Sequence, residues 1–161
     1  MNSSVFQLPI QSKQLDAFDL SIFQDLCVTA STRSVSLFDL GQLSVSLSDI
    51  PFETMDRTSK LLFQGTGTRV AALRLGSIWI LDPSSALRPF VGLVEGNGST
   101  MTDMDWSPTN SSILSTTTEN GSLKVWDIRS PSNPGHLLNF GNYDHTLTEK
   151  YLSTSWCPYN P

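Results

Sequence analysis

Asp103 and Asp105 are the residues of this sequence whose type and spacing come closest to a catalytic arrangement. Carboxylates at positions i and i+2 of a β-strand point to the same face, where two of them could work as general acid and general base. Aspartates at strand ends and turns more often accept hydrogen bonds from nearby groups. We therefore interpret this pair as structural acceptors, and we predict no catalytic residue and a protein that is not an enzyme.

The histidines and cysteines lack the spacing of a metal or redox site. His136 and His145 are the two histidines of the chain, and neither accompanies a second ligand or a nucleophile motif. Cys27 and Cys157 lie far apart, and neither belongs to a Cys-x-x-Cys pair, so we interpret them as small packing residues. The sequence predicts no metal ion and no cofactor.

Residues 65–70 read Gly-Thr-Gly-Thr-Arg-Val, a partial match to the glycine-rich loop of dinucleotide-binding proteins. The third glycine of that loop is missing, and the residues that follow do not open a helix. We predict a tight turn between two strands at this place.

The composition indicates a globular protein with an acidic balance. Of 161 residues 39% are hydrophobic, and 10 Lys and Arg stand against 15 Asp and Glu, for a net charge of −5. Nucleic acids and anionic membranes attract clustered cations, whereas these cations are scattered singly, so we expect neither as a partner. Residues 1–10 lack the features of a secretion signal, and we expect a cytoplasmic or nuclear protein.

Short runs rich in Val, Ile, Leu, Phe and Thr alternate with Gly, Ser, Asn and Asp clusters, which predicts an all-β fold. Three runs close with a large apolar residue followed by aspartate, at Asp39, Asp82 and Asp127, spaced 43 and 45 residues apart. One four-stranded propeller blade takes about 40 to 45 residues. A second repeat supports this period, because Asp105-Trp-Ser-Pro-Thr-Asn110 recurs 50 residues later as Ser155-Trp-Cys-Pro-Tyr-Asn160.

On these repeats the sequence resembles the WD40 family of β-propellers, most specifically between Gly96 and Arg129. The strands of this unit are expected at Met101 to Trp106, Ile113 to Thr117, Gly121 to Asp127 and His136 to Phe140. The third strand ends in the Trp126-Asp127 dipeptide that names the family, and we interpret Trp106, Trp126 and Asp127 as structural. Phe38-Asp39 and Leu81-Asp82 replace the dipeptide in two degenerate units, the second with strands at 59–64, 69–75, 77–82 and 89–94.

The resemblance implies an all-β fold, an incomplete WD40-type β-propeller built of four-stranded antiparallel blades. We expect an N-terminal segment at 1–15, a candidate outer closing strand, and a partial propeller at 16–161, with blades at about 16–55, 56–95 and 96–142 and the start of a fourth at 147–161. An open arc exposes apolar flanks and unpaired strand edges. We therefore expect a truncated form of a larger protein or, less favoured, a partner that completes the ring, with self-association through the open edges.

The resemblance also implies a non-catalytic scaffold or adaptor that binds other proteins within a multiprotein complex. Candidate contact residues lie in the loops before and within the best-matched unit: Asn97, Thr100, Thr102, Glu119 and Asn120. Asn97 stands where the family has histidine, and Glu119 stands in the place of its aspartate. These replacements leave open whether the family's buried His–Asp hydrogen bonds form in this chain.

Arg129 suggests a sharper alternative. The stretch from Leu114 to Arg129 resembles the box that some WD40 proteins present to the adaptor of cullin-4 ubiquitin ligases, with small residues, an acidic residue, alternating aliphatics and a final Trp-Asp-x-Arg. A substrate receptor of such a ligase is therefore an alternative function, with Arg129 on the face opposite the other candidates. An enzyme subunit or a small-molecule-binding propeller is the alternative of a different class.

Overall fold

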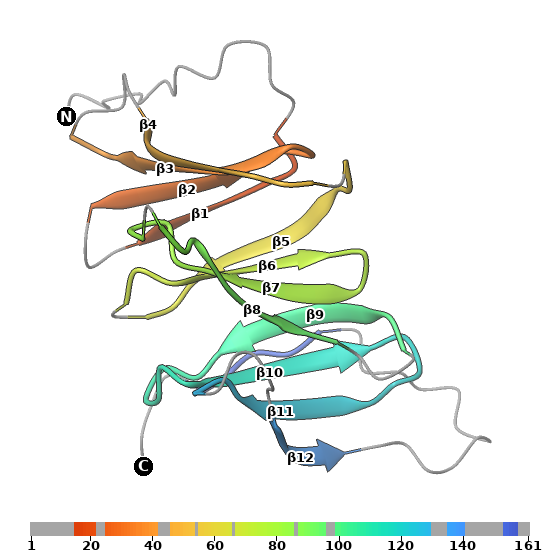
Figure 1. The fold of residues 1–161 in the computed structure, drawn as a ribbon. Coiled ribbons are helices and arrows are strands. Elements are labelled where there is room, and N and C mark those ends of the chain that lie inside the picture. Colours follow the sequence, from red (N-terminus) through yellow and green to blue (C-terminus); the bar gives the residue numbers. More distant parts are fainter. Residues whose placement is uncertain are drawn as a thin grey trace, which may run out of the picture.

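A computed structural model of the chain describes residues 15–21, 25–41, 46–53, 55–65, 67–85, 87–95, 99–129, 135–140 and 153–157. This part of the chain contains strands and turns but no helix. The strands form three antiparallel sheets of four strands each, stacked one after another along the chain (Figure 1). The all-β architecture of four-stranded antiparallel blades is therefore confirmed.

Each blade is built of four consecutive strands in sequence order. The first blade contains β1 (Ala17–Ser21), β2 (Leu26–Ala30), β3 (Ser34–Asp39) and β4 (Ser46–Pro51). The second contains β5 (Thr58–Phe63), β6 (Val70–Arg74), β7 (Ser77–Leu81) and β8 (Phe90–Val94). The third contains β9 (Met101–Trp106), β10 (Ile113–Thr118), β11 (Leu123–Asp127) and β12 (Gly135–Phe140).

Several predicted strands differ from the observed ones by a residue or two, and in two of them the extra end residues belong to turns. The strand expected from Gly121 begins at Leu123, since Gly121 has a φ of 80° and donates its N–H to Thr118 O at 2.9 Å. The strand expected to end at Leu75 ends at Arg74, because Leu75 has a φ of 44°. Left-handed backbone of this kind closes a turn and cannot continue a strand.

Residues 64–69 connect β5 to β6, which are neighbouring antiparallel strands of one sheet. The segment is closed by hydrogen bonds from Gln64 N to Arg69 O at 2.8 Å and from Gly67 N to Gln64 O at 3.0 Å. The turn predicted for this glycine-rich stretch is correct. The predicted closing strand within residues 1–14 and the candidate Asn97 lie outside the described residues.

The apolar core lies between the blades, because alternate residues of each strand face opposite neighbours. Leu61 and Phe63 of β5 face the first blade, whereas Leu62 between them faces the third. The cluster between the first two blades also holds Val28, Ala30, Val35, Leu37, Ile50, Val70, Ala72 and Leu81. The cluster between the second and third holds Ala71, Leu73, Ile78, Ile80, Val94, Met101, Met104, Trp106, Leu114, Trp126 and Ile128.

A glycine fixes the seam between the second and third blades. Gly76 ends the β6–β7 turn with a φ of 71°, and its carbonyl accepts the N–H of Met101 at 3.0 Å. A Cβ at Gly76 would lie 2.9 Å from Thr100 Cα and 3.1 Å from Met101 N, both backbone atoms that cannot easily move. Only glycine permits this approach of the turn to the start of β9.

Leu73→Ala should lower the free energy of unfolding by about 2–5 kcal/mol, because it removes a buried aliphatic group and leaves a cavity between two blades. Leu73 is 1% exposed, whereas Leu87, the control position, is 94% exposed. Leu87→Ala should change stability by less than about 0.5 kcal/mol. Urea denaturation followed by tryptophan fluorescence measures both, and equal effects of the two substitutions would contradict the assignment of the core.

Candidate functional site

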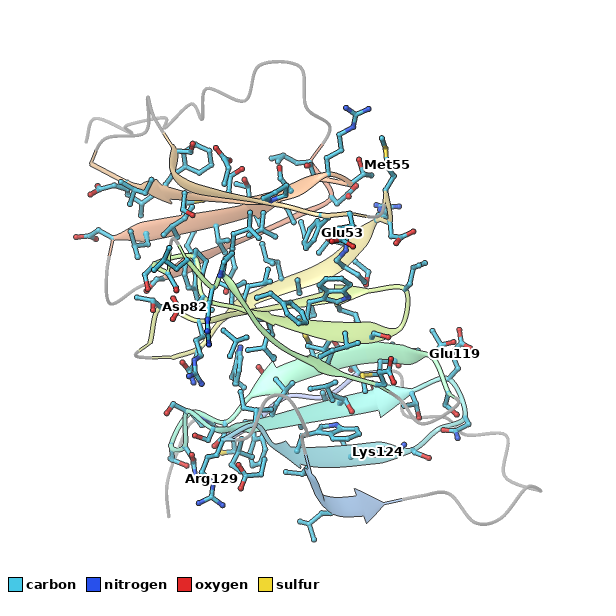
Figure 2. The ribbon with its side chains drawn as sticks, viewed as in Figure 1. Glu53, Met55, Asp82, Glu119, Lys124 and Arg129 are labelled. Carbon is cyan, nitrogen blue, oxygen red and sulfur yellow. The ribbon has the colours of Figure 1, made fainter. Side chains whose placement is uncertain are left out.

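One end of the blades is here called the top face. It carries the turn between the second and third strands of each blade and the connections from one blade to the next. It consists of the turns Thr32–Arg33, Leu75–Gly76 and Glu119–Asn120, and of the described parts of the connections 52–57 and 95–100. The opposite end, the bottom face, carries the described parts of the segments 64–69 and 82–89, the segment 107–112 and residues 128–129. Figure 2 shows Met55 and Glu119 on the side of the top face and Asp82 and Arg129 on the other.

The predicted top-face residues of the third blade divide into two groups. Thr100 and Glu119 are exposed, and they are held together because Glu119 N donates to Thr100 O at 2.9 Å. Thr102 instead turns its hydroxyl toward Thr117, at 3.0 Å between the two Oγ1 atoms. Asn120 Oδ1 accepts hydrogen bonds from the hydroxyl of Thr118 and from Ser122 N, so this side chain shapes the turn.

A pocket of about 230 Å³ opens at the top of the second blade, a feature that the sequence did not indicate. It is lined by Asp56, Arg74, Leu75, Ser77, Trp79 and Leu93. Trp79 packs edge-to-face against Phe52 and Phe90, with ring centroids 5.8 and 5.2 Å away. Aromatic pairs favour this edge-to-face geometry, so the three rings pack together beside the pocket.

Arg74 at the base of this pocket is 1% exposed, which is unusual for an arginine. Its guanidinium lies over the Phe52 ring, 3.5 Å from the centroid, and donates to Thr58 Oγ1 at 2.9 Å and to Thr32 O at 3.4 Å. Burial lowers the pKa of Arg74, and the charges of Asp56 and Asp16 oppose that change. The side chain therefore ties the top ends of the first two blades together.

Aspartates on the first strand of a blade bind backbone N–H groups of the unit that follows. Asp19 Oδ2 accepts from Phe63 N at 2.8 Å, across the first two blades. Asp105 Oδ2 accepts from Trp156 N at 2.8 Å, and Asp103 Oδ2 accepts from Thr154 N at 2.9 Å. Asp103 and Asp105 therefore do have the acceptor role that their sequence context predicted.

Residues 153–157 lie against β9 through these carboxylates, without a strand ladder. The hydroxyls of Ser115 and Thr154 are 3.0 Å apart, and the Trp156 indole donates to Asp105 O at 3.2 Å. The Trp106 indole makes the equivalent bond to Leu62 O at 3.3 Å. The sequence repeat at a spacing of 50 residues therefore corresponds to the same tryptophan contact in two successive units.

Trp106, Trp126 and Asp127, predicted to be structural, have these surroundings. Trp106 and Trp126 are buried in the cluster between the second and third blades, and the Trp126 indole donates to Thr116 Oγ1 at 2.9 Å. Asp127 binds the backbone N–H of Arg129 at 3.0 Å and its guanidinium through Nε and Nη2. Arg129 remains largely exposed, on the bottom face.

Among the described residues, no group of three or more histidine, cysteine or acidic side chains is placed to hold a metal ion. The described chain also has no helix with the length and apolar character needed to span a membrane. His136 lies on β12, and His145 lies outside the described residues.

Comparison with known proteins gives one sequence relative and several related folds. No family model matches the chain. Protein DSE1 of Yarrowia lipolytica is 27% identical over 155 residues, which cover 91% of this chain and 21% of that protein. The chain therefore spans about a fifth of the curated relative that it matches.

Three solved structures show the same arrangement of strands. Chaetomium thermophilum Sqt1, bound to the N-terminus of the ribosomal protein L10, matches with a TM-score of 0.64 and 18% identity over 80% of this chain and 34% of its own. The WD40 repeats of RRP9 match with a TM-score of 0.67 and 16% identity, covering 85% and 42%. U3-55K matches with a TM-score of 0.67 and 14% identity, covering 84% and 41%.

The hydrogen bonds from Arg129 hold the pKa of Asp127 below its usual value. The contact should therefore be complete at neutral pH and lost only as the pH falls through the lowered pKa. A carbon-detected NMR titration should give a midpoint for Asp127 below the usual value of about 3.9, and Arg129→Ala should return it toward that value. An unchanged midpoint in the variant would show that Arg129 does not hold this carboxylate.

Proposed function

We propose that this chain, which has the fold of part of a WD40 β-propeller, is a non-catalytic protein-binding scaffold. The observation that carries the proposal is the top face, where hydrogen bonds hold the turns in place, and one of them, from Arg74 to Thr32 O, joins the first two blades. Gly76 O binds Met101 N, and Thr100 O binds Glu119 N. A surface fixed in advance loses little conformational entropy when a partner binds.

The side chains on this face suit a protein partner. Met55 and Leu75 are 66% and 75% exposed on this face, and Leu75 lines the pocket beside Trp79. Glu53, Glu95 and Glu119 are exposed acidic residues of the same face. Apolar anchors within a polar rim are typical of protein interfaces.

A related fold gives further support, because the solved Sqt1 structure is bound to the N-terminus of a ribosomal protein. We infer that a polypeptide segment of another protein is the class of ligand for this chain as well. The net charge of −5 disfavours nucleic acid as the direct ligand. A cytoplasmic or nuclear location remains part of the proposal.

Arg129 supports a second candidate, the substrate receptor of a cullin-4 ubiquitin ligase. Its side chain is 76% exposed, yet Asp127 holds the guanidinium in one position. An arginine that is oriented before binding is well suited to pair with a carboxylate of a partner. The contact would use the bottom face and leave the top face for a substrate.

The top-face proposal is tested with Leu75→Asp combined with Glu119→Lys, and with Leu87→Asp as control. Leu75 has a left-handed φ of 44°, which aspartate tolerates, so the double variant should fold. We expect the proteins that copurify with the tagged chain from its own cells to fall at least tenfold in the double variant by quantitative mass spectrometry. The same proteins should remain in the Leu87→Asp control, and their loss from the control alone would overturn the proposal.

The ubiquitin-ligase candidate is tested separately with Arg129→Ala. The purified adaptor subunit of cullin-4 ligases should bind the unmodified chain with measurable affinity and lose at least tenfold in the variant, because truncation removes a charged contact worth about 1.5–3 kcal/mol. Calorimetry measures both affinities. Failure of the unmodified chain to bind the adaptor would remove this candidate and leave the top-face proposal unaffected.

A further inference from the structure

The pocket at the top of the second blade has the size of a single side chain. Its volume of about 230 Å³ is below the range of roughly 300–1,000 Å³ that is usual for sites that enclose a whole small-molecule ligand. The pocket therefore fits one protruding residue of a partner better than a complete cofactor or metabolite.

The lining of the pocket favours an uncharged side chain. Leu75, Trp79 and Leu93 supply apolar surface, and the two charged residues, Asp56 and Arg74, have opposite signs. Arg74 is already held by a hydroxyl, a backbone carbonyl and an aromatic ring. A charged group that entered would lose its hydration for little net attraction, whereas an aliphatic or aromatic group gains from burial alone.

Exposed apolar side chains extend the surface that a partner could cover. Leu75 lines the pocket and is 75% exposed, and Met55, the neighbour of the lining residue Asp56, is 66% exposed. Methionine adapts its shape to an irregular partner surface. A filled pocket with apolar neighbours is the usual composition of the few residues that dominate an interface.

The charges of the top face indicate what should accompany the apolar side chain. The described residues of this face carry four acidic side chains, Glu53, Asp56, Glu95 and Glu119, and two basic ones, Arg33 and Arg57. Arg57 Nε also lies 3.8 Å from Asp16 Oδ1, which offsets part of its charge. Glu53 and Glu95 stand within three residues of the lining residues Asp56 and Leu93, so a basic partner segment complements this face.

We propose that the pocket holds one large apolar side chain of a polypeptide segment that carries Lys or Arg beside it. This inference rests on the proposed scaffold function and names the class of segment that the scaffold binds. The apolar side chain would fill the space beside Trp79 and Leu93, and the adjacent cations would pair with Glu53 and Glu95.

A phage-displayed library of short random peptides, selected on the purified chain, tests the proposal. The recovered peptides should share a Leu, Met, Phe or Trp with Lys or Arg among its neighbours. In fluorescence anisotropy with the most enriched peptide, replacing the apolar residue by Ala or the basic residues by Gln should weaken binding at least tenfold. Recovered peptides without this pattern, or no enrichment at all, would overturn the proposal.

Variants of the chain then locate the contact. Leu93→Lys places a charge in the pocket, and Leu75→Asn removes part of its apolar wall at a left-handed φ of 44° that asparagine accepts. Each should weaken binding of the enriched peptide at least tenfold. Far-UV circular dichroism checks their folding, and Leu75→Asn decides the question if Leu93→Lys unfolds. A folded variant that binds as tightly as the unmodified chain shows that the pocket is not the site.

The contribution of charge is measured with Glu53→Gln combined with Glu95→Gln, which should weaken binding at least threefold and reduce its dependence on salt. The matched control, Leu47→Lys combined with Leu87→Lys, changes the net charge equally at residues that are 58% and 94% exposed and do not line the pocket. Equal effects of the two double variants would contradict a local role of the glutamates.

The copurification experiment with Leu75→Asp and Glu119→Lys separates this inference from the function on which it rests. Partners that are lost there, while the selected peptides lack the pattern or ignore the pocket, refute the inference alone. Partners that are retained there refute the top-face scaffold itself.

Discussion

The arrangement of the blades depends on how their first strands satisfy backbone N–H groups that face a neighbouring blade. β5 lies against β1, yet the two belong to different sheets, so no strand ladder supplies acceptors between them. Asp19 supplies one for Phe63, and Asp103 and Asp105 supply two for residues 153–157. A buried donor without an acceptor costs about 1–3 kcal/mol, so these carboxylates fix how far each first strand can slide past the next.

The second and third blades pack in the same way, but a backbone carbonyl takes the place of the aspartate carboxylate as hydrogen-bond acceptor. Leu62 stands where Asp19 and Asp105 stand in the other blades and carries no carboxylate, but its carbonyl accepts the Trp106 indole. Lys60 Nζ meets Asp103 at 2.7 Å, although the lysine is about one-third exposed and water weakens the pair. The apolar cluster of this seam also buries two tryptophans, Trp106 and Trp126.

Local patterns predicted the strands well, because the alternation of apolar and polar residues and the residue types of turns can be recognised from neighbouring positions in the sequence. β9 has the expected bounds, and the repeated tryptophans Trp106 and Trp156 make equivalent indole hydrogen bonds. The sequence did not predict the burial of Arg74 or the pocket beside it, because an arginine at the end of an apolar strand normally reaches solvent. Its burial depends on Thr32, Phe52 and Thr58, which are far from it in sequence.

Arg74 links this packing to the shape of the top face. A desolvated guanidinium is tolerated only where hydrogen bonds, an aromatic ring and nearby carboxylates compensate its charge. Those groups come from the turn at Thr32, the connection after β4 and the start of β5, so movement of any one of them would leave a buried charge poorly compensated. The position of Arg74 in the pocket wall therefore depends on residues of both the first and the second blade.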